Sequence, residues 1–255
     1  MIHPSMQERK MSFGEIYGAS WAVYTRNFAY MAVITLLGYG PIAITTMFMP
    51  QASFDVILNM YSLAPEQLNK LMTSSIFMLG LYVLFLPPTI SAITSVTASY
   101  IVTGKATVER TLSDSLAKWG WLALSGAIFA TIVLLTAALV IPAIFFFVSF
   151  YFFPNLAVLM KLGSVRSLQA SYQIVKKHWF ATLGFIISNF LLSVVATSLL
   201  SALFSWISLT LVGFVIITLI VQLGGSYFTI ASTIYIMNKM LLLGKPMAPL
   251  ANNEQ

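Results

Sequence analysis

The stretch Trp179–Asn238 reads WFATLGFIISNFLLSVVATSLLSALFSWISLTLVGFVIITLIVQLGGSYFTIASTIYIMN, and none of its 60 residues is Asp, Glu, Lys, Arg or His. Because a helix rises 1.5 Å per residue, about 20 apolar residues cross the hydrocarbon core of a bilayer once. The stretch is therefore long enough for two membrane-spanning helices, and we place the turn between them near Ser205–Thr210.

Three further stretches lack the same five residue types: Asn27–Phe54, Leu71–Gly104 and Trp119–Met160. The first two have room for one spanning helix each, and the third has room for a pair. We place the turn of that pair at 140–142, because Pro142 lacks the N–H group that a continuous helix would use. The six predicted spans are 28–49, 74–102, 119–140, 143–160, 180–204 and 212–237.

The overall composition supports a polytopic membrane protein. Hydrophobic residues make up 59% of the chain and charged residues only 8%, whereas an ordinary soluble domain is about 25% charged. A soluble fold of this size has too small an interior to bury so much apolar surface. Cysteine is absent, which excludes disulfides, thiolate catalysis and cysteine-ligated metals.

The basic residues predict the orientation. With six spans, twelve of the thirteen lysines and arginines fall on one side of the membrane, and only Lys70 falls on the other. The positive-inside rule then places both termini in the cytoplasm. We accordingly divide the chain into a cytoplasmic N-terminal segment, 1–27, a six-helix transmembrane domain, 28–238, and a cytoplasmic tail, 239–255.

A short amphipathic segment precedes each odd-numbered span, with apolar residues three and four positions apart, as on one face of a helix. Ser12 and Glu15 have the spacing of a capping box at the start of the first segment. We therefore expect an all-α fold of three hairpins, each preceded by a cytoplasmic interfacial helix; the alternative is that these segments are ordinary juxtamembrane linkers. The aligned residues are Phe13, Ile16, Tyr17, Ser20 and Tyr24, then Val108, Leu112, Leu116 and Trp119, then Val165, Leu168, Tyr172 and Val175.

Prolines mark the second span. Pro65 suits the first turn of a helix that leads into it. The pair Pro87-Pro88 predicts that this helix is kinked or broken further along.

No residue set in the sequence has the pattern of a catalytic, cofactor or metal site, so we predict that the chain is not an enzyme. The uncharged spans contain Asn155, Asn189 and Gln222 as their amide side chains. Each is either a polar step on a pathway or a hydrogen bond between helices, and we favour the hydrogen bond. Ser91, Ser95 and Ser99 similarly suggest close helix packing over a hydroxyl-lined conduit, and Gly224-Gly225 suggests a close contact or a flexible step. His178, beside two lysines, suggests a lipid-headgroup contact rather than a metal ligand.

The order of these features resembles the YciC-like bacterial inner-membrane proteins over nearly the whole chain. This resemblance implies a six-helix protein of the bacterial cytoplasmic membrane without an assigned function; Ala143 stands where such proteins usually have glycine. A weaker resemblance links Ser12–Phe28 and Ser164–Trp179 to the membrane region of some glycerophosphodiester phosphodiesterases, whose catalytic barrel this sequence lacks. The YciC-like resemblance rests on Phe54-Asp55, Asn59-Met60, Pro65-Glu66-Gln67, Pro142 and Ser164–Trp179.

Two hypotheses of function follow. The first is a non-enzymatic envelope protein that contacts partner proteins or membrane lipids, with anionic headgroups at the basic cytoplasmic loops; we expect no cofactor and no nucleic acid. The second is a transporter or lipid-translocating protein for a neutral or amphipathic substrate. A cavity lined by Thr89, Thr94, Asn155 or Gln222 would favour the second, and a solid helical bundle the first.

Overall fold

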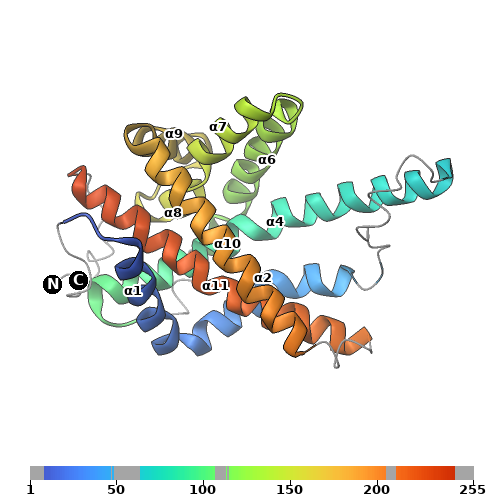
Figure 1. Ribbon diagram of the computed structural model, residues 1–255, viewed down its shortest axis with the longest axis horizontal. Coiled ribbons are helices and arrows are strands. Elements are labelled where there is room, and N and C mark those ends of the chain that lie inside the picture. The colour runs from blue at the N-terminus through green and yellow to red at the C-terminus, as the bar shows by residue number, and fades with distance from the viewer. Residues whose placement is uncertain are drawn as a thin grey trace.

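The computed structural model describes residues 9–46, 48, 64–106, 113, 115–204 and 211–244. Helices make up 89% of these residues, and no strand occurs among them, which confirms the all-α prediction. Figure 1 shows their arrangement. The helices are α1 (Phe13–Arg26), α2 (Phe28–Thr46), α4 (Pro65–Thr103), α6 (Trp119–Thr136), α7 (Val140–Phe150), α8 (Phe153–Leu159), α9 (Ser164–Val175), the short 3-10 helix η2 (Lys176–His178), α10 (Trp179–Leu203) and α11 (Leu211–Leu242).

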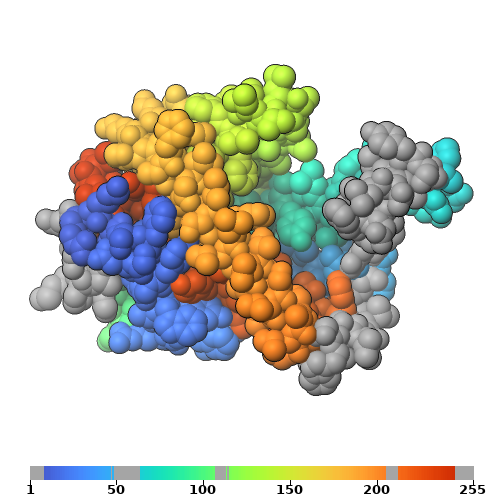
Figure 2. Space-filling view, in the orientation of Figure 1, coloured from blue at the N-terminus to red at the C-terminus, as the bar shows by residue number. Residues whose placement is uncertain are grey.

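Six helical segments in the described part of the chain are long and apolar enough to cross a membrane, as predicted. Large apolar side chains also lie on the molecular surface: Phe180 is 82% exposed, and Phe190 and Leu203 are 63% and 68% exposed. All three belong to α10, which runs across the face shown in Figure 2. A bilayer is the solvent that accepts such a surface. The chain is a polytopic α-helical membrane protein.

The C-terminal half of α11 forms the centre of the bundle. Every residue from Ile230 to Met240 is buried, because α11 packs against α1, α2, α4 and α10. The beginning of the described chain lies against the end of this helix: the Met11 N–H donates to Asn238 Oδ1 at 3.2 Å, and Asn238 Nδ2 donates to the Arg9 carbonyl at 3.0 Å. The buried stretch also contains the polar residues Ser232, Thr233, Asn238 and Lys239.

Helix α4 is longer than its predicted span. It begins at Pro65, which occupies the first turn as predicted, and ends at Gly104 in the left-handed conformation (φ 73°). Its 39 residues measure about 58 Å at 1.5 Å per residue, about twice the thickness of the hydrocarbon core. In Figure 1 its first half projects away from the other helices.

The helix continues through Pro87-Pro88 without a break. Neighbouring helices approach this point closely through glycines. A Cβ atom on Gly38 of α2 would lie 2.0 Å from Thr89 Oγ1, and one on Gly126 of α6 would lie 2.8 Å from Pro87 Cγ. The sequence predicted either a kink or a break at these prolines. Close packing of α2 and α6 on two sides of α4 instead keeps the helix continuous.

The turn before α7 lies at 137–139 rather than at 140–142. Pro142 instead occupies the first turn of α7, where an N–H group has no helical acceptor and its absence costs nothing. The predicted span 143–160 also divides into α7 and α8, with Pro154 in the first turn of α8. The turn predicted at Ser205–Thr210 lies outside the described residues.

Two of the three amphipathic segments are described, and both are helices. Ser12 and Glu15 form the predicted capping box of α1, yet its apolar face packs on protein: Tyr17 and Tyr227 stack at 6.4 Å, and the Tyr24 hydroxyl donates to the Leu223 carbonyl. In α9 the predicted apolar face packs on protein only in part. Leu168 and Val175 are buried and Val165 and Tyr172 are exposed, while the small residues Ser167, Ala170 and Ser171 let the helix approach its neighbours. Most of the segment with Val108 and Leu112 lies outside the described residues.

Candidate functional site

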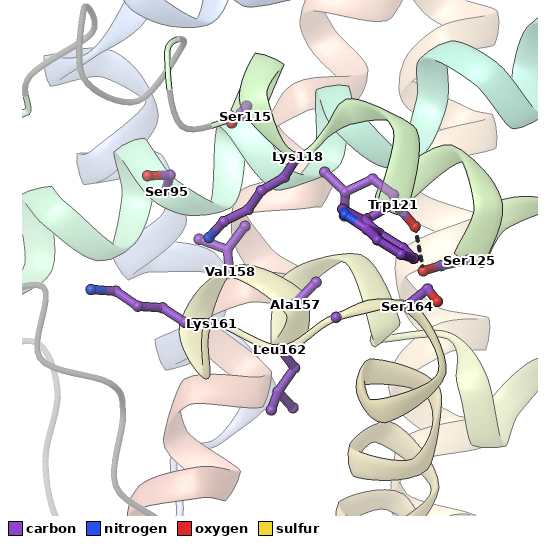
Figure 3. A pocket seen from close by; sticks show the side chains of 12 residues that line it. Ser95, Ser115, Lys118, Trp121, Ser125, Ala157, Val158, Lys161, Leu162 and Ser164 are labelled. Carbon is purple, nitrogen blue, oxygen red and sulfur yellow. Dashed lines mark hydrogen bonds between the residues drawn. The ribbon is translucent and has the colours of Figure 1, made fainter.

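A cavity of about 270 Å³ lies where the C-terminal half of α4, the beginning of α6 and the α8–α9 turn meet. Two lysines border it: Lys118 immediately precedes α6, and Lys161 follows α8. Figure 3 shows both side chains extending toward the side on which Ser95 lies. Hydroxyl groups and an indole complete the polar wall: Ser95, Ser115, Ser125, Ser164 and Trp121. We call this cavity the basic pocket.

The backbone at Lys161 is unusual. Its φ is +51°, and among the described residues it is the only one other than glycine with a positive φ. The turn that requires this conformation ends α8: the Leu162 N–H donates to the Ala157 carbonyl, and the Lys161 N–H donates to the Val158 carbonyl. Glycine is the usual residue here, since a side chain in this region costs roughly 1–2 kcal/mol. A lysine at such a position points to a use for its side chain.

Two helix N-termini face the basic pocket. The residues that cap α6 and α9, Lys118 and Gly163, both line it, and neither helix has a side-chain cap or an acidic residue in its first turn. The first N–H groups of a helix lack helical partners, and the end carries a partial positive charge. Two lysines, two such helix ends and several hydroxyls together favour an anion, above all a phosphate.

Acidic residues are few in the described part of the chain, and none of those described borders the basic pocket. They are Glu15, which pairs with Arg9, and Glu66, which pairs with Lys70 in the first turn of α4. Glu109 and Asp114 belong to the segment before α6 and lie outside the described residues. Neither Lys118 nor Lys161 therefore has a described carboxylate partner.

Two of the three predicted amide residues, Asn155 and Asn189, hydrogen-bond to other helices. Asn155 Nδ2 donates to Thr94 Oγ1 at 2.8 Å and to Thr233 Oγ1 at 3.0 Å, which joins α8 to α4 and α11. Ser91 Oγ donates to the Pro154 carbonyl at 3.1 Å beside this cluster. The favoured interpretation of Asn155 as a hydrogen bond between helices is confirmed, and Ser91 lies at a close helix contact, as its predicted packing role requires.

Asn189 also joins two helices. Its Nδ2 donates to the Phe228 carbonyl and to Ser232 Oγ at 3.3 and 3.4 Å. Gly224 makes the predicted close contact, because a Cβ atom there would lie 3.0 Å from Leu200 Cδ1. The headgroup contact of His178 stays a prediction.

The bundle is not solid. A cavity of about 410 Å³ borders Asn155, and a cavity of about 730 Å³ borders Gln222. These are two of the residues whose exposure to a cavity was expected to favour translocation. Asn155 therefore joins α8 to α4 and α11 and also forms part of a cavity wall.

Sequence reasoning missed the basic pocket as a unit. It placed Lys118 and Lys161 in two separate basic loops, since nothing in their spacing indicates that the loops meet. One available signal was that each lysine comes directly before or after an apolar stretch. Among the described residues, no three His, Asp or Glu side chains lie together as metal ligands would; the absence of catalytic, cofactor and metal sites stays a prediction.

Comparison with protein-family models, with curated proteins and with solved structures finds no match to this chain. The YciC-like resemblance accordingly stays a prediction, and the function is argued from the site.

Proposed function

We propose that this chain is a non-enzymatic protein of the bacterial cytoplasmic membrane that binds anionic phospholipids through the basic pocket. The observation that carries the proposal is the convergence of Lys118, Lys161 and two uncapped helix N-termini on one cavity. In the proposed orientation both termini and the pocket are cytoplasmic, where anionic headgroups attract basic residues by about 1 kcal/mol each. A protein partner would bind at the same face.

Native mass spectrometry of the detergent-solubilised protein tests the proposal. We expect dioleoylphosphatidylglycerol to bind more tightly than dioleoylphosphatidylcholine, and the preference to weaken in the double variant Lys118→Gln/Lys161→Gln. The matched control is Lys176→Gln/Lys177→Gln, which removes two exposed lysines outside the pocket. Equal loss of preference in both double variants would indicate attraction by net charge alone and would contradict a built site.

A second function is supported by the two larger cavities: translocation of an uncharged or amphipathic lipid. Asn155 and Gln222 border them, and Pro87 of α4 lies at the wall of the smaller one. A scrambling assay in vesicles tests this function. Fluorescent phosphatidylethanolamine that crosses at the rate of protein-free vesicles would exclude it for that lipid.

A further inference from the structure

The two larger cavities are neighbours. Both are bordered by Tyr39, Phe147, Tyr151 and Thr229, so they meet around the same four side chains. One extends from there toward Pro87 of α4, and the other extends toward Phe190 of α10 and Gln222 of α11. We call the latter, of about 730 Å³, the lateral cavity. Its volume lies within the range of about 300–1,000 Å³ that is typical of small-molecule sites.

The wall of the lateral cavity is apolar and partly open to the surroundings of the bundle. Ile144, Ile187 and Phe190 border it and are 44%, 48% and 63% exposed. In a membrane-spanning protein, such exposed apolar side chains contact lipid chains. A molecule would therefore enter from the bilayer, and its greater part would be hydrocarbon.

The polar groups in this wall are uncharged. No Asp, Glu, Lys, Arg or His is among the described residues that border either cavity. An ionised headgroup would lose its hydration there without a compensating charge, which is costly in a bilayer. The amides of Asn189 and Gln222 and the hydroxyls of Ser193 and Thr197 suit a neutral polar head instead.

Asn189 specifies the hydrogen-bonding character of that head. The Phe228 carbonyl can only accept, so the donation to it fixes Nδ2 on that side of the amide. The other atom, Oδ1, is buried and has no donor in hydrogen-bonding geometry, although the Tyr151 hydroxyl interacts with the same amide. An under-satisfied buried acceptor is costly, and a ligand hydroxyl would supply a well-placed donor.

We propose that the lateral cavity binds an uncharged single-chain amphipath with a hydroxyl-bearing head, of the monoacylglycerol type, with its head toward Asn189 and its chain along Phe190. The site shares no residue with the basic pocket. It therefore stands independently of the anionic-lipid function.

The test uses the full chain in phosphatidylcholine nanodiscs and monooleoylglycerol with a diazirine in its acyl chain. We expect saturable photolabelling on α7, α10 and α11. Unlabelled monooleoylglycerol should compete for the site, whereas methyl oleate, which lacks the hydroxyl donors, should compete up to about tenfold less well, as expected for one hydrogen bond.

Two variants locate the site. A Cβ atom on Gly225 has its nearest neighbour, Gln222 Oε1, at an ordinary 3.7 Å, so Gly225→Leu fills the lateral cavity and should abolish saturable labelling. Gly184→Leu is the control, because Gly184 is exposed on α10 with no atom near its Cβ position. Asn189→Leu should retain labelling but lose the preference over methyl oleate. Labelling that does not saturate, that persists in Gly225→Leu, or that keeps its preference in Asn189→Leu would overturn the proposal.

Discussion

The indole N–H of Trp119 donates to the carbonyl oxygen of Leu84 at 2.7 Å. In a regular helix this carbonyl would accept from the N–H of residue 88, but residue 88 is proline. The first residue of α6 thus supplies one of the two donors that α4 lacks at its double proline. The Phe85 and Trp119 rings, 5.2 Å apart, pack edge to face at the same place. Trp119 therefore holds α6 against α4.

This relationship predicts the effect of Trp119→Phe. The change keeps an aromatic ring but leaves the Leu84 carbonyl without its donor, so we expect a loss of about 1–2 kcal/mol in unfolding free energy. Thermal unfolding in nanodiscs measures it. Trp121→Phe is the control, since Trp121 is 62% exposed. Equal changes in the two variants would show that the indole bond contributes nothing specific.

Gly38 predicts a second effect at the same prolines. In Gly38→Ala the new methyl group would lie 2.0 Å from Thr89 Oγ1, so α2 and α4 must separate. We expect a loss of about 1–3 kcal/mol, as for overpacked cores. Gly80→Ala, with no atom within 4 Å of its Cβ position, should be neutral or slightly stabilising. A Gly38→Ala protein with the melting temperature of the native protein would contradict the close helix contact.

Lys161→Gly separates stability from binding. Glycine adopts the positive φ of this position without strain, so we expect a gain of up to about 1 kcal/mol in unfolding free energy. The same variant should bind phosphatidylglycerol more weakly, because the pocket loses one of its two charges. Thermal unfolding and lipid titration on one preparation measure both. A variant that is no more stable, or that binds the lipid unchanged, would contradict a lysine retained for its charge.

Stability at acid pH depends on Glu15. Its hydrogen bonds to the Arg9 side chain and to the Ser12 backbone and hydroxyl lower the pKa of the carboxyl group to about 2. Because the folded-state pKa lies below the usual value of about 4.3, the contribution is present above that value and is lost as the pH falls toward 2. The protection of the α1 amides, which is their exchange rate relative to the intrinsic rate at the same pH, should decrease over this range. At pH 6 the α1 amides of Glu15→Gln should be less protected than those of the native protein, and their protection should decrease less as the pH falls. An equal decrease in both proteins would show that groups other than Glu15 cause it.

The fold was predictable where charge is absent. Apolar length alone indicates the six spans, because a bilayer requires about 20 uncharged residues for each crossing. Local turn chemistry was less decisive. Pro142 suits both a turn and the first turn of a helix, and in the structure it lies in the first turn of α7. The buried face of α9 is likewise set by its neighbours, whose close approach favours Ser167 and Ser171 over Val165.

The site was less predictable than the fold. Asn155 was correctly interpreted as a link between helices, since an amide in a lipid-embedded helix needs a partner. The pairing of Lys118 with Lys161 depends on how two distant turns meet, which no local pattern contains. The double proline was expected to kink or break α4, but Trp119, 31 positions beyond Pro88, supplies one of the two missing hydrogen bonds.

The most direct test of the anionic-lipid function is a phosphorus-to-nitrogen distance measurement by solid-state NMR. The protein carries ¹⁵N-labelled lysine and is reconstituted with phosphatidylglycerol. Our account predicts a ³¹P–¹⁵N dipolar contact that falls much more in Lys118→Gln/Lys161→Gln than in Lys176→Gln/Lys177→Gln. An equal fall in the two variants, or no contact in the native protein, would contradict it.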